Sequence, residues 1–214
     1  MKTDQKIECS IVLVDLSGFT QLLYQSSTSE KTMELVLKSI ETLFRKSGEA
    51  TKRTKHVQII NTTGDGFIAI ARGTTPSRTA VDFAKLVQKQ FEKYVKQTIS
   101  SVPFRQRVDL RIALHHGTIY KIEIPFKDKT FPLYIGDDLN LLARVINSQT
   151  SRRFTFAVTK SFYKRLMLTR KTPIPDEVIL DRNRYPEEIE VFRIPDEIPK
   201  YKTKKAKPKT QTTS

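Results

Sequence analysis

Two aspartates stand where the sequence predicts hydrophobic strands to end. Asp15 closes the apolar run IVLVD, and Asp65 lies in the turn of NTTGDGF between two apolar segments. A strand that pairs with a neighbouring hairpin can bring two such carboxylates close together, where they repel each other unless a cation lies between them. Mg²⁺ suits this arrangement because it takes oxygen ligands and completes its coordination with substrate phosphates. The two residues therefore predict metal-dependent chemistry on a phosphorylated substrate.

The turn that follows Asp15 adds to this hypothesis. Ser17 and Gly18 come just before a predicted helical segment, and their backbone N–H groups would face a phosphate there. Asp and Gly are also common in ordinary turns, so the stretch alone does not separate a phosphate site from a simple strand end.

An amide and a guanidinium form a second candidate group. Asn140 and Arg144 are four residues apart in GDDLNLLARV, so a helix would place them on one face. Such a stripe is ordinary on a solvated helix. Beside a metal site, however, it would suit a ribose and a charged transition state.

The elements that position these residues follow from apolar periodicity. Strands are predicted at 7–15, 57–62, 66–72, 107–124 (as two strands turning at Gly117-Thr118), 154–159 and 187–194. Helices are predicted at 29–48, 75–100, 137–149 and 161–168. Local hairpins imply antiparallel pairing, so the order predicts an α+β fold with helices over one face of the sheet.

Composition sets the class of protein. The 214 residues carry a formal net charge of +15, which favours polyanionic partners or a phosphate-rich substrate. Cys9 is the single cysteine, and no run is apolar enough to span a membrane, so we expect a cytoplasmic protein without stable membrane insertion. The region 1–198 is predicted to form one catalytic domain, and the lysine-rich segment 199–214 is predicted to be disordered.

Four motifs in order identify a family. The aspartate before SGFT, the GDGF hairpin, RIALHHG and GDDLNLLAR together resemble the class III nucleotidyl cyclase catalytic domain over roughly residues 8–194. The resemblance implies a ferredoxin-like α+β core with a mixed, mostly antiparallel sheet covered by helices. It also implies a head-to-tail homodimer with the active sites at the interface.

The resemblance assigns roles to individual residues. Asp15, Asp65 and the carbonyl of Leu16 would hold two divalent metal ions, Mg²⁺ or Mn²⁺. From the other subunit, Asn140 would orient the ribose and Arg144 would neutralise charge at the α-phosphate. The residues expected to contact the phosphates of the nucleoside triphosphate are Ser17, Gly18, Phe19, Thr20 and, near the last strand, either Arg182 or Arg184.

The positions that read the base depart from the family pattern. Adenylate cyclases carry a lysine and an aspartate where this chain has Asn61 and Leu133. Leucine offers no hydrogen bond, so the adenine-reading pair is absent, as is the glutamate of guanylate cyclases. Three explanations compete: an inactive domain, a purine cyclase with other base contacts, or a cyclase for another base.

A free-standing cyclase domain with this replacement resembles the pyrimidine cyclases of the bacterial Pycsar anti-phage system. These make cyclic UMP or cyclic CMP, which activates a separate effector protein. The resemblance favours UTP over CTP as substrate, with a purine nucleotide as the alternative.

Two other functions would also fit some features. A nucleic-acid-binding module would explain the positive charge, but six of the lysines lie in the segment 199–214 and no nucleic-acid motif is present, so a nucleic-acid partner is not expected. A metal-bound scaffold without catalysis is the other alternative. The pair His115-His116 is interpreted as structural, because class III metals take oxygen ligands.

Overall fold

The structure is a computed structural model that describes residues 5–17, 24, 30–99, 109–147, 156–167, 177–179 and 189–194. Several residues with predicted roles lie outside these ranges: Gly18, Phe19, Thr20, Arg182, Arg184 and the segment 199–214.

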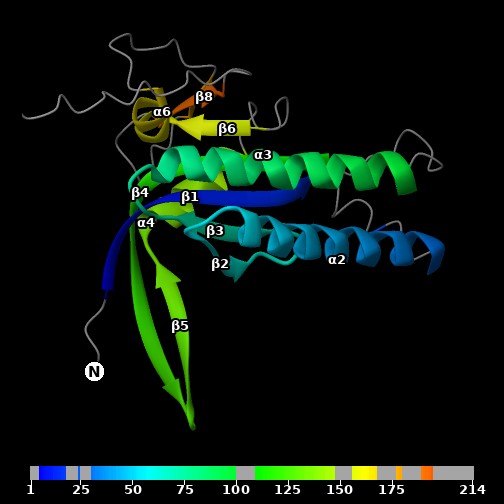
Figure 1. Cartoon of the computed structure of the whole chain (residues 1–214), viewed down its shortest axis with the longest axis horizontal. Helices are drawn as coiled ribbons and strands as arrows, with labels where there is room; N and C mark the ends of the chain where they lie inside the picture. Colours follow the sequence, from blue (N-terminus) through cyan, green and yellow to red (C-terminus); the bar gives the residue numbers. More distant parts are fainter. Residues whose placement is uncertain are drawn as a thin grey trace, which may run out of the picture.

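One eight-stranded sheet forms the centre of the described part of the chain (Figure 1). Its strands follow the order β2 (Val57–Thr62), β3 (Phe67–Ala71), β1 (Gln5–Ser17), β4 (Asp109–Phe126), β6 (Phe156–Thr159), β8 (Ile189–Arg193) and β7 (Glu177–Ile179), with β5 (Lys129–Ile135) paired to β4 off this path. The β4–β6 pair is parallel, and the other neighbouring pairs are antiparallel. The mixed, mostly antiparallel sheet predicted from the sequence is therefore confirmed.

The helices cover both faces of the sheet, and not one face as predicted. One face packs against α2 (Glu30–Arg53), α3 (Pro76–Tyr94) with the π-helical turn η1 (Val95–Ile99), and α6 (Lys160–Met167). The other face packs against α4 (Asp137–Ile146). The reason lies in β1, where alternate residues point to opposite faces and both sets are apolar and buried. Such a strand requires cover on each side.

The strand β4 corrects a second expectation. The sequence predicted two strands turning at Gly117-Thr118, but β4 runs through both residues, which pair with Cys9 and Glu8 of β1. The chain turns later, after Phe126, and returns as β5, which was not predicted. The short strand β7 was not predicted either. In β4, the glycine marks a place of close packing and not a turn.

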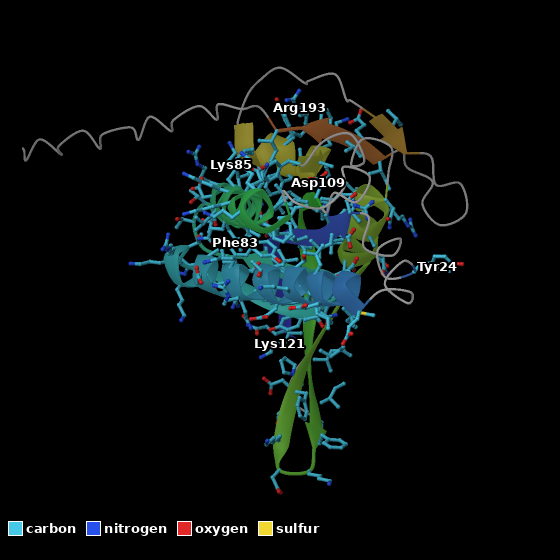
Figure 2. The ribbon with its side chains drawn as sticks, turned by 90° about the vertical axis from the view of Figure 1, so that its right-hand side faces the viewer. Tyr24, Phe83, Lys85, Asp109, Lys121 and Arg193 are labelled. Carbon is cyan, nitrogen blue, oxygen red and sulfur yellow. The ribbon has the colours of Figure 1, made fainter. Side chains whose placement is uncertain are left out.

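The paired ends of β4 and β5, residues 120–135, project from the body as a two-stranded arm, called the β4–β5 arm below. Figure 2 shows the same projection from a second side, with Lys121 where the arm leaves the body. The arm exposes large apolar side chains, namely Tyr120, Ile124, Phe126, Phe131, Leu133 and Ile135. None of the helices in the described residues has the length and apolar character needed to cross a bilayer.

Candidate active site

The carboxylates of Asp15 and Asp65 meet at the end of β1. Val14 pairs with Phe67, which brings the β2–β3 turn against the strand just before Asp15. Gly66 makes this approach possible: a Cβ there would lie 2.1 Å from the backbone oxygen of Val14 and 3.0 Å from Cα of Asp15. The Gly-Asp-Gly turn therefore places Asp65 directly beside Asp15.

The surroundings of Asp65 disfavour its ionisation. Burial raises the pKa of the Asp65 carboxyl, and the negative charge of Asp15 raises it further. Two carboxylates held this close have a local excess of negative charge, which a cation would neutralise.

Arg111 supplies part of this neutralisation. It lies opposite Asp15 in the β1–β4 ladder, and its Nε donates to Oδ2 of Asp15 at 3.1 Å. Its Nη2 forms an ion pair with the same oxygen. Both bonds use Oδ2, so the second carboxylate oxygen of Asp15 takes no part in this ion pair. Sequence analysis missed Arg111, because only the strand register places residue 111 against residue 15.

The donor set fits a hard divalent cation. Two carboxylates at a strand end offer oxygen ligands, which Mg²⁺ and Mn²⁺ prefer. Within the described residues, no group of three or more His, Cys, Asp or Glu side chains gathers as a metal site. Asp15 and Asp65 would therefore hold metal together with other oxygens, such as substrate phosphates. Leu16 buries its side chain in the core, and Ser17 is partly exposed at the end of the strand.

Asn140 and Arg144 lie on the face of α4 that is turned away from the sheet. Leu142, Val145 and Ile146 are buried on the opposite face of this helix. Asn140 is exposed and Arg144 is half-buried. The two polar residues therefore share one outward stripe, as their spacing predicts.

Both ends of α4 are fixed to β4. At the start, Asp138 accepts the backbone N–H of Thr118 at 2.6 Å and contacts Nε2 of His115 at 2.9 Å. At the end, the carbonyl of Ile146 accepts from Nη1 of Arg111 at 3.4 Å. Arg111 thus contacts both the carboxylate at the end of β1 and the last turn of α4.

The two histidines both have structural partners. His115 joins β4 to α4 through Asp138 and to β6 through Thr159 Oγ1, at 2.8 Å. His116 contacts Ser10 at 3.0 Å and Glu8 at 3.1 Å. Burial lowers the pKa of His116 despite the contact with Glu8. These contacts agree with the structural interpretation of the pair.

Within one chain, Asp15 and Asn140 lie toward opposite ends of the β1–β4 pair. The start of α4 is tied to Thr118, whose partner on β1 is Glu8. Asp15 lies seven residues further along β1, which corresponds to roughly 23 Å of strand. Arg144 lies further along α4, in the last turn, and the Ile146 carbonyl of that turn contacts Arg111, so the helix runs from the Thr118 end of the pair toward the Asp15 end. Below, Asp15 and Asp65 are called the carboxylate half of the predicted site, and Asn140 and Arg144 on the outward face of α4 are called the α4 half.

The two residues predicted to contact the base also come from separate strands. Asn61 is exposed on β2, and its Oδ1 accepts the backbone N–H of Thr62 at 2.9 Å. Leu133 is exposed on β5, opposite Ile122. In the strand order, β2 and β5 lie on two sides of β1.

The fold is similar to solved nucleotide cyclases. The adenylyl cyclase CyaB from P. aeruginosa aligns with a TM-score of 0.68 and 12% identity, over 91% of this chain and 97% of that one. The guanylyl cyclase Cya2 aligns with a TM-score of 0.68 and 15% identity, over 87% and 91% of the two chains. The guanylate cyclase domain of RhGC from Catenaria anguillulae, solved with GTP, aligns with a TM-score of 0.61 and 16% identity, over 87% and 96%. At these identities, the likeness shows the fold.

The sequence itself carries the family assignment. No curated protein matches the chain. The model of the adenylate and guanylate cyclase catalytic domain matches residues 1–184, which is most of the chain. This extent of match and the shared fold show that the chain belongs to the class III family of adenylate and guanylate cyclase catalytic domains.

Proposed function

We propose that this domain converts a pyrimidine nucleoside triphosphate, UTP or CTP, to its 3′,5′-cyclic monophosphate and pyrophosphate. The observation that carries the proposal is the carboxylate pair Asp15 and Asp65 at the end of β1, whose negative charge Arg111 compensates only in part. In this reaction the ribose 3′-oxygen forms a bond to the α-phosphorus as the bond to pyrophosphate breaks, and the 3′-hydroxyl loses its proton. Divalent cations, when bound, lower the pKa of that hydroxyl and offset charge on the phosphates.

The residues of the chain would position the nucleotide. Asp15 and Asp65 would hold the cations, with Arg111 fixing the orientation of the Asp15 carboxylate through Oδ2. Asn140 would orient the ribose so that the 3′-oxygen lies in line with the leaving pyrophosphate. Arg144 would stabilise the charge that builds on the α-phosphate and on the leaving group. Ser17, the turn 18–20, and Arg182 or Arg184 are proposed as triphosphate contacts.

The site would be completed by a second copy of the chain. Asn140 and Arg144 lie on the face of α4 that is turned away from their own sheet, and Asn140 is close to the helix start that is tied to Thr118, far along β1 from Asp15. A two-fold partner would bring its α4 half against the carboxylate half of the first chain. The β4–β5 arm supports this arrangement, because its exposed apolar side chains are typical of a surface that a partner covers.

The proposed base rests on Asn61 and Leu133. Leu133 cannot pair with the polar edge of a purine, and each group left unpaired on burial costs about 1–3 kcal/mol. Asn61 can both donate and accept, so it can hold a smaller pyrimidine with few other contacts. The sequence resemblance supports a role in anti-phage signalling, in which the cyclic product activates a separate effector protein. A purine cyclase with other base contacts is the alternative.

A panel of the four nucleoside triphosphates with Mg²⁺ or Mn²⁺, with products identified by mass, tests the reaction and the base. We expect the cyclic monophosphate of UTP or CTP at a rate about tenfold or more above ATP and GTP, the factor that 1.4 kcal/mol gives. Asn61→Ala should lower this preference while leaving metal-dependent thermal stabilisation unchanged. A clear preference for ATP or GTP would overturn the pyrimidine assignment. Nucleotide binding without any cyclic product would overturn the activity.

Mixing variants tests the shared site. Asp15→Asn disables the carboxylate half, and Arg144→Ala disables the α4 half, so each homodimer should be inactive. A heterodimer of the two retains one complete site. Random exchange of equal amounts should therefore restore about a quarter of the wild-type activity. If proven subunit exchange restores nothing, the site lies within one chain.

A further inference from the structure

We propose that Asp138 and His115 are positioning residues that fix the first turn of α4, and thereby present Asn140 and Arg144 to the carboxylates of the partner subunit. The inference rests on the proposed function and extends it to two residues that do not touch the substrate.

The carboxylate of Asp138 is held by two donors from β4. Oδ2 accepts the backbone N–H of Thr118 at 2.6 Å, and Oδ1 lies 2.9 Å from Nε2 of His115. Burial alone would raise the pKa of Asp138, but the bonds from His115 and Thr118 outweigh burial, and the pKa of this carboxyl is lowered. Asp138 is therefore an ionised acceptor that receives Nε2–H of His115.

His115 is itself fixed from the other side. Its side chain is 8% exposed, and Nδ1 lies 2.8 Å from Thr159 Oγ1 on β6 and 3.2 Å from Ser161 Oγ on α6. With Nε2–H donated to Asp138, Nδ1 accepts from one of these hydroxyl groups. The ring thus links β6, β4 and the start of α4 in one chain of bonds.

Gly117 provides the space for this link. A Cβ at residue 117 would lie 2.1 Å from Oδ2 of Asp138 and 2.7 Å from Nε2 of His115. Gly117 lies inside the continuous strand β4, so the chain does not turn there. The absence of a side chain allows Asp138 and His115 to approach each other closely.

The link determines where the catalytic face of α4 lies. The helix has only ten residues, and Gly136 at its N-cap offers no side-chain hydrogen bond. Asp138 anchors it two residues before Asn140 and six before Arg144. A displacement of about 1 Å in a positioned group can cost roughly a hundredfold in rate. A loose first turn would therefore displace Asn140 directly, and it would change the tilt of the helix that carries Arg144.

The test uses Asp138→Ala, with Asp137→Ala as the matched control. Asp137 is the neighbouring acidic residue of the same helical turn and is exposed, so its loss removes the same charge and keeps the link. We expect Asp138→Ala to lower kcat at least tenfold with a smaller change in KM, and to retain the Mn²⁺-dependent rise in Tm, because its carboxylate half is intact. Asp137→Ala should stay within about twofold of wild type in kcat. Asp138→Asn, which keeps an acceptor for Thr118, should restore part of the lost rate.

Complementation shows which half of the site is affected. Asp138→Ala should regain activity when mixed with Asp15→Asn, and should regain none when mixed with Arg144→Ala. A general folding defect would give recovery with neither partner, and would overturn the inference. Equal kcat for Asp138→Ala and wild type, or recovery with Arg144→Ala, would also overturn it. If the reference pair Asp15→Asn and Arg144→Ala fails to complement, the proposed shared site fails instead, so the two failures are distinguishable.

Discussion

At the scale of single residues, Asp65 is a carboxyl group whose environment opposes its charged form. Its pKa is raised because it is buried and because Asp15 lies beside it. A carboxyl with a raised pKa in the folded state binds its proton more tightly there than in the unfolded chain. Its contribution to the free energy of unfolding is therefore present below about pH 4, the ordinary range of aspartic acid, and is lost as pH rises through the folded-state pKa.

Asp65→Asn removes the free-energy cost of ionising residue 65 in the folded protein, because the amide keeps the size of the side chain and carries no charge. We expect the metal-free variant to have a higher Tm than metal-free wild type at pH 7, with a difference that shrinks toward pH 4. Mg²⁺ or Mn²⁺ should raise the Tm of wild type and have little effect on the variant. Cyclase activity should fall at least about a hundredfold, which corresponds to roughly 2.7 kcal/mol. Thermal melts across pH, with and without metal, test the predicted changes in Tm. An activity assay tests the predicted loss of turnover, and near-normal turnover of Asp65→Asn would contradict a role of Asp65 in metal binding.

The sequence predicted the residues that follow from local patterns and missed those that depend on strand register. Asp15 and Asp65 were predicted to approach each other because each ends or interrupts an apolar strand, and the structure places them together. Arg111 and Asp138 were not identified. Their partners are far along the chain, and only the β1–β4 register and the return of α4 bring them close. One local pattern could have pointed to Arg111: the alternation in RIALHHG places Arg111 and His115 on the same face of a strand.

At the scale of elements, glycines decide how closely segments approach. The hairpin β2–β3 and the helix α2 were predicted within a few residues, because Gly-Asp-Gly and a helical apolar period are local signals. Gly117 misled the prediction, since a glycine that accommodates a distant side chain has the same sequence signature as one in a turn. Gly66 combines both roles, because it belongs to a turn and also admits the backbone of β1.

A pair of alanine substitutions tests whether the close approach of β1 requires a glycine at residue 66. Gly66→Ala should destabilise the protein by about 1–3 kcal/mol, because the new methyl group would meet the backbone oxygen of Val14, which cannot rotate away. Gly48→Ala is the control: it lies inside α2 with nothing within 4 Å of the added Cβ. Alanine there should raise the free energy of unfolding by about 0.5–1 kcal/mol. Denaturant unfolding measures both, and equal effects would show that space around Gly66 is not limiting.

At the scale of the whole molecule, one chain carries an arm with exposed apolar side chains and both proposed halves of the shared site. Phe126 and Phe131 lie edge to face near the tip of the β4–β5 arm, and both are more than half exposed. No local signal predicted this arm, because its second strand contains Pro132 and lacks a clear alternation. Exposed apolar side chains that gather on one arm are typical of a surface that a partner covers, which supports the proposed dimer.

Phe131→Ser should therefore weaken dimerisation. We expect the variant to sediment as a monomer at concentrations where wild type is a dimer, because burial of an aromatic side chain contributes about 1.5–3 kcal/mol per subunit. Leu37→Ser is the control: Leu37 is 58% exposed on α2, close to the 52% of Phe131. Its substitution should leave the sedimentation coefficient unchanged. A dimeric Phe131→Ser variant would show that the arm does not form the contact.

The outward face of α4, which would meet the carboxylates of a second chain, has a consequence for how protein abundance controls activity. If two chains must meet to build a site, the rate below the dimer dissociation constant rises with the square of the protein concentration. A small rise in expression then gives a larger rise in cyclic nucleotide, and dilution turns the reaction off without an inhibitor. We expect specific activity to fall on serial dilution and to return on reconcentration. A specific activity that stays constant down to nanomolar concentrations would mean that each chain works alone or that the dimer is permanent, and dimer cross-linking distinguishes the two.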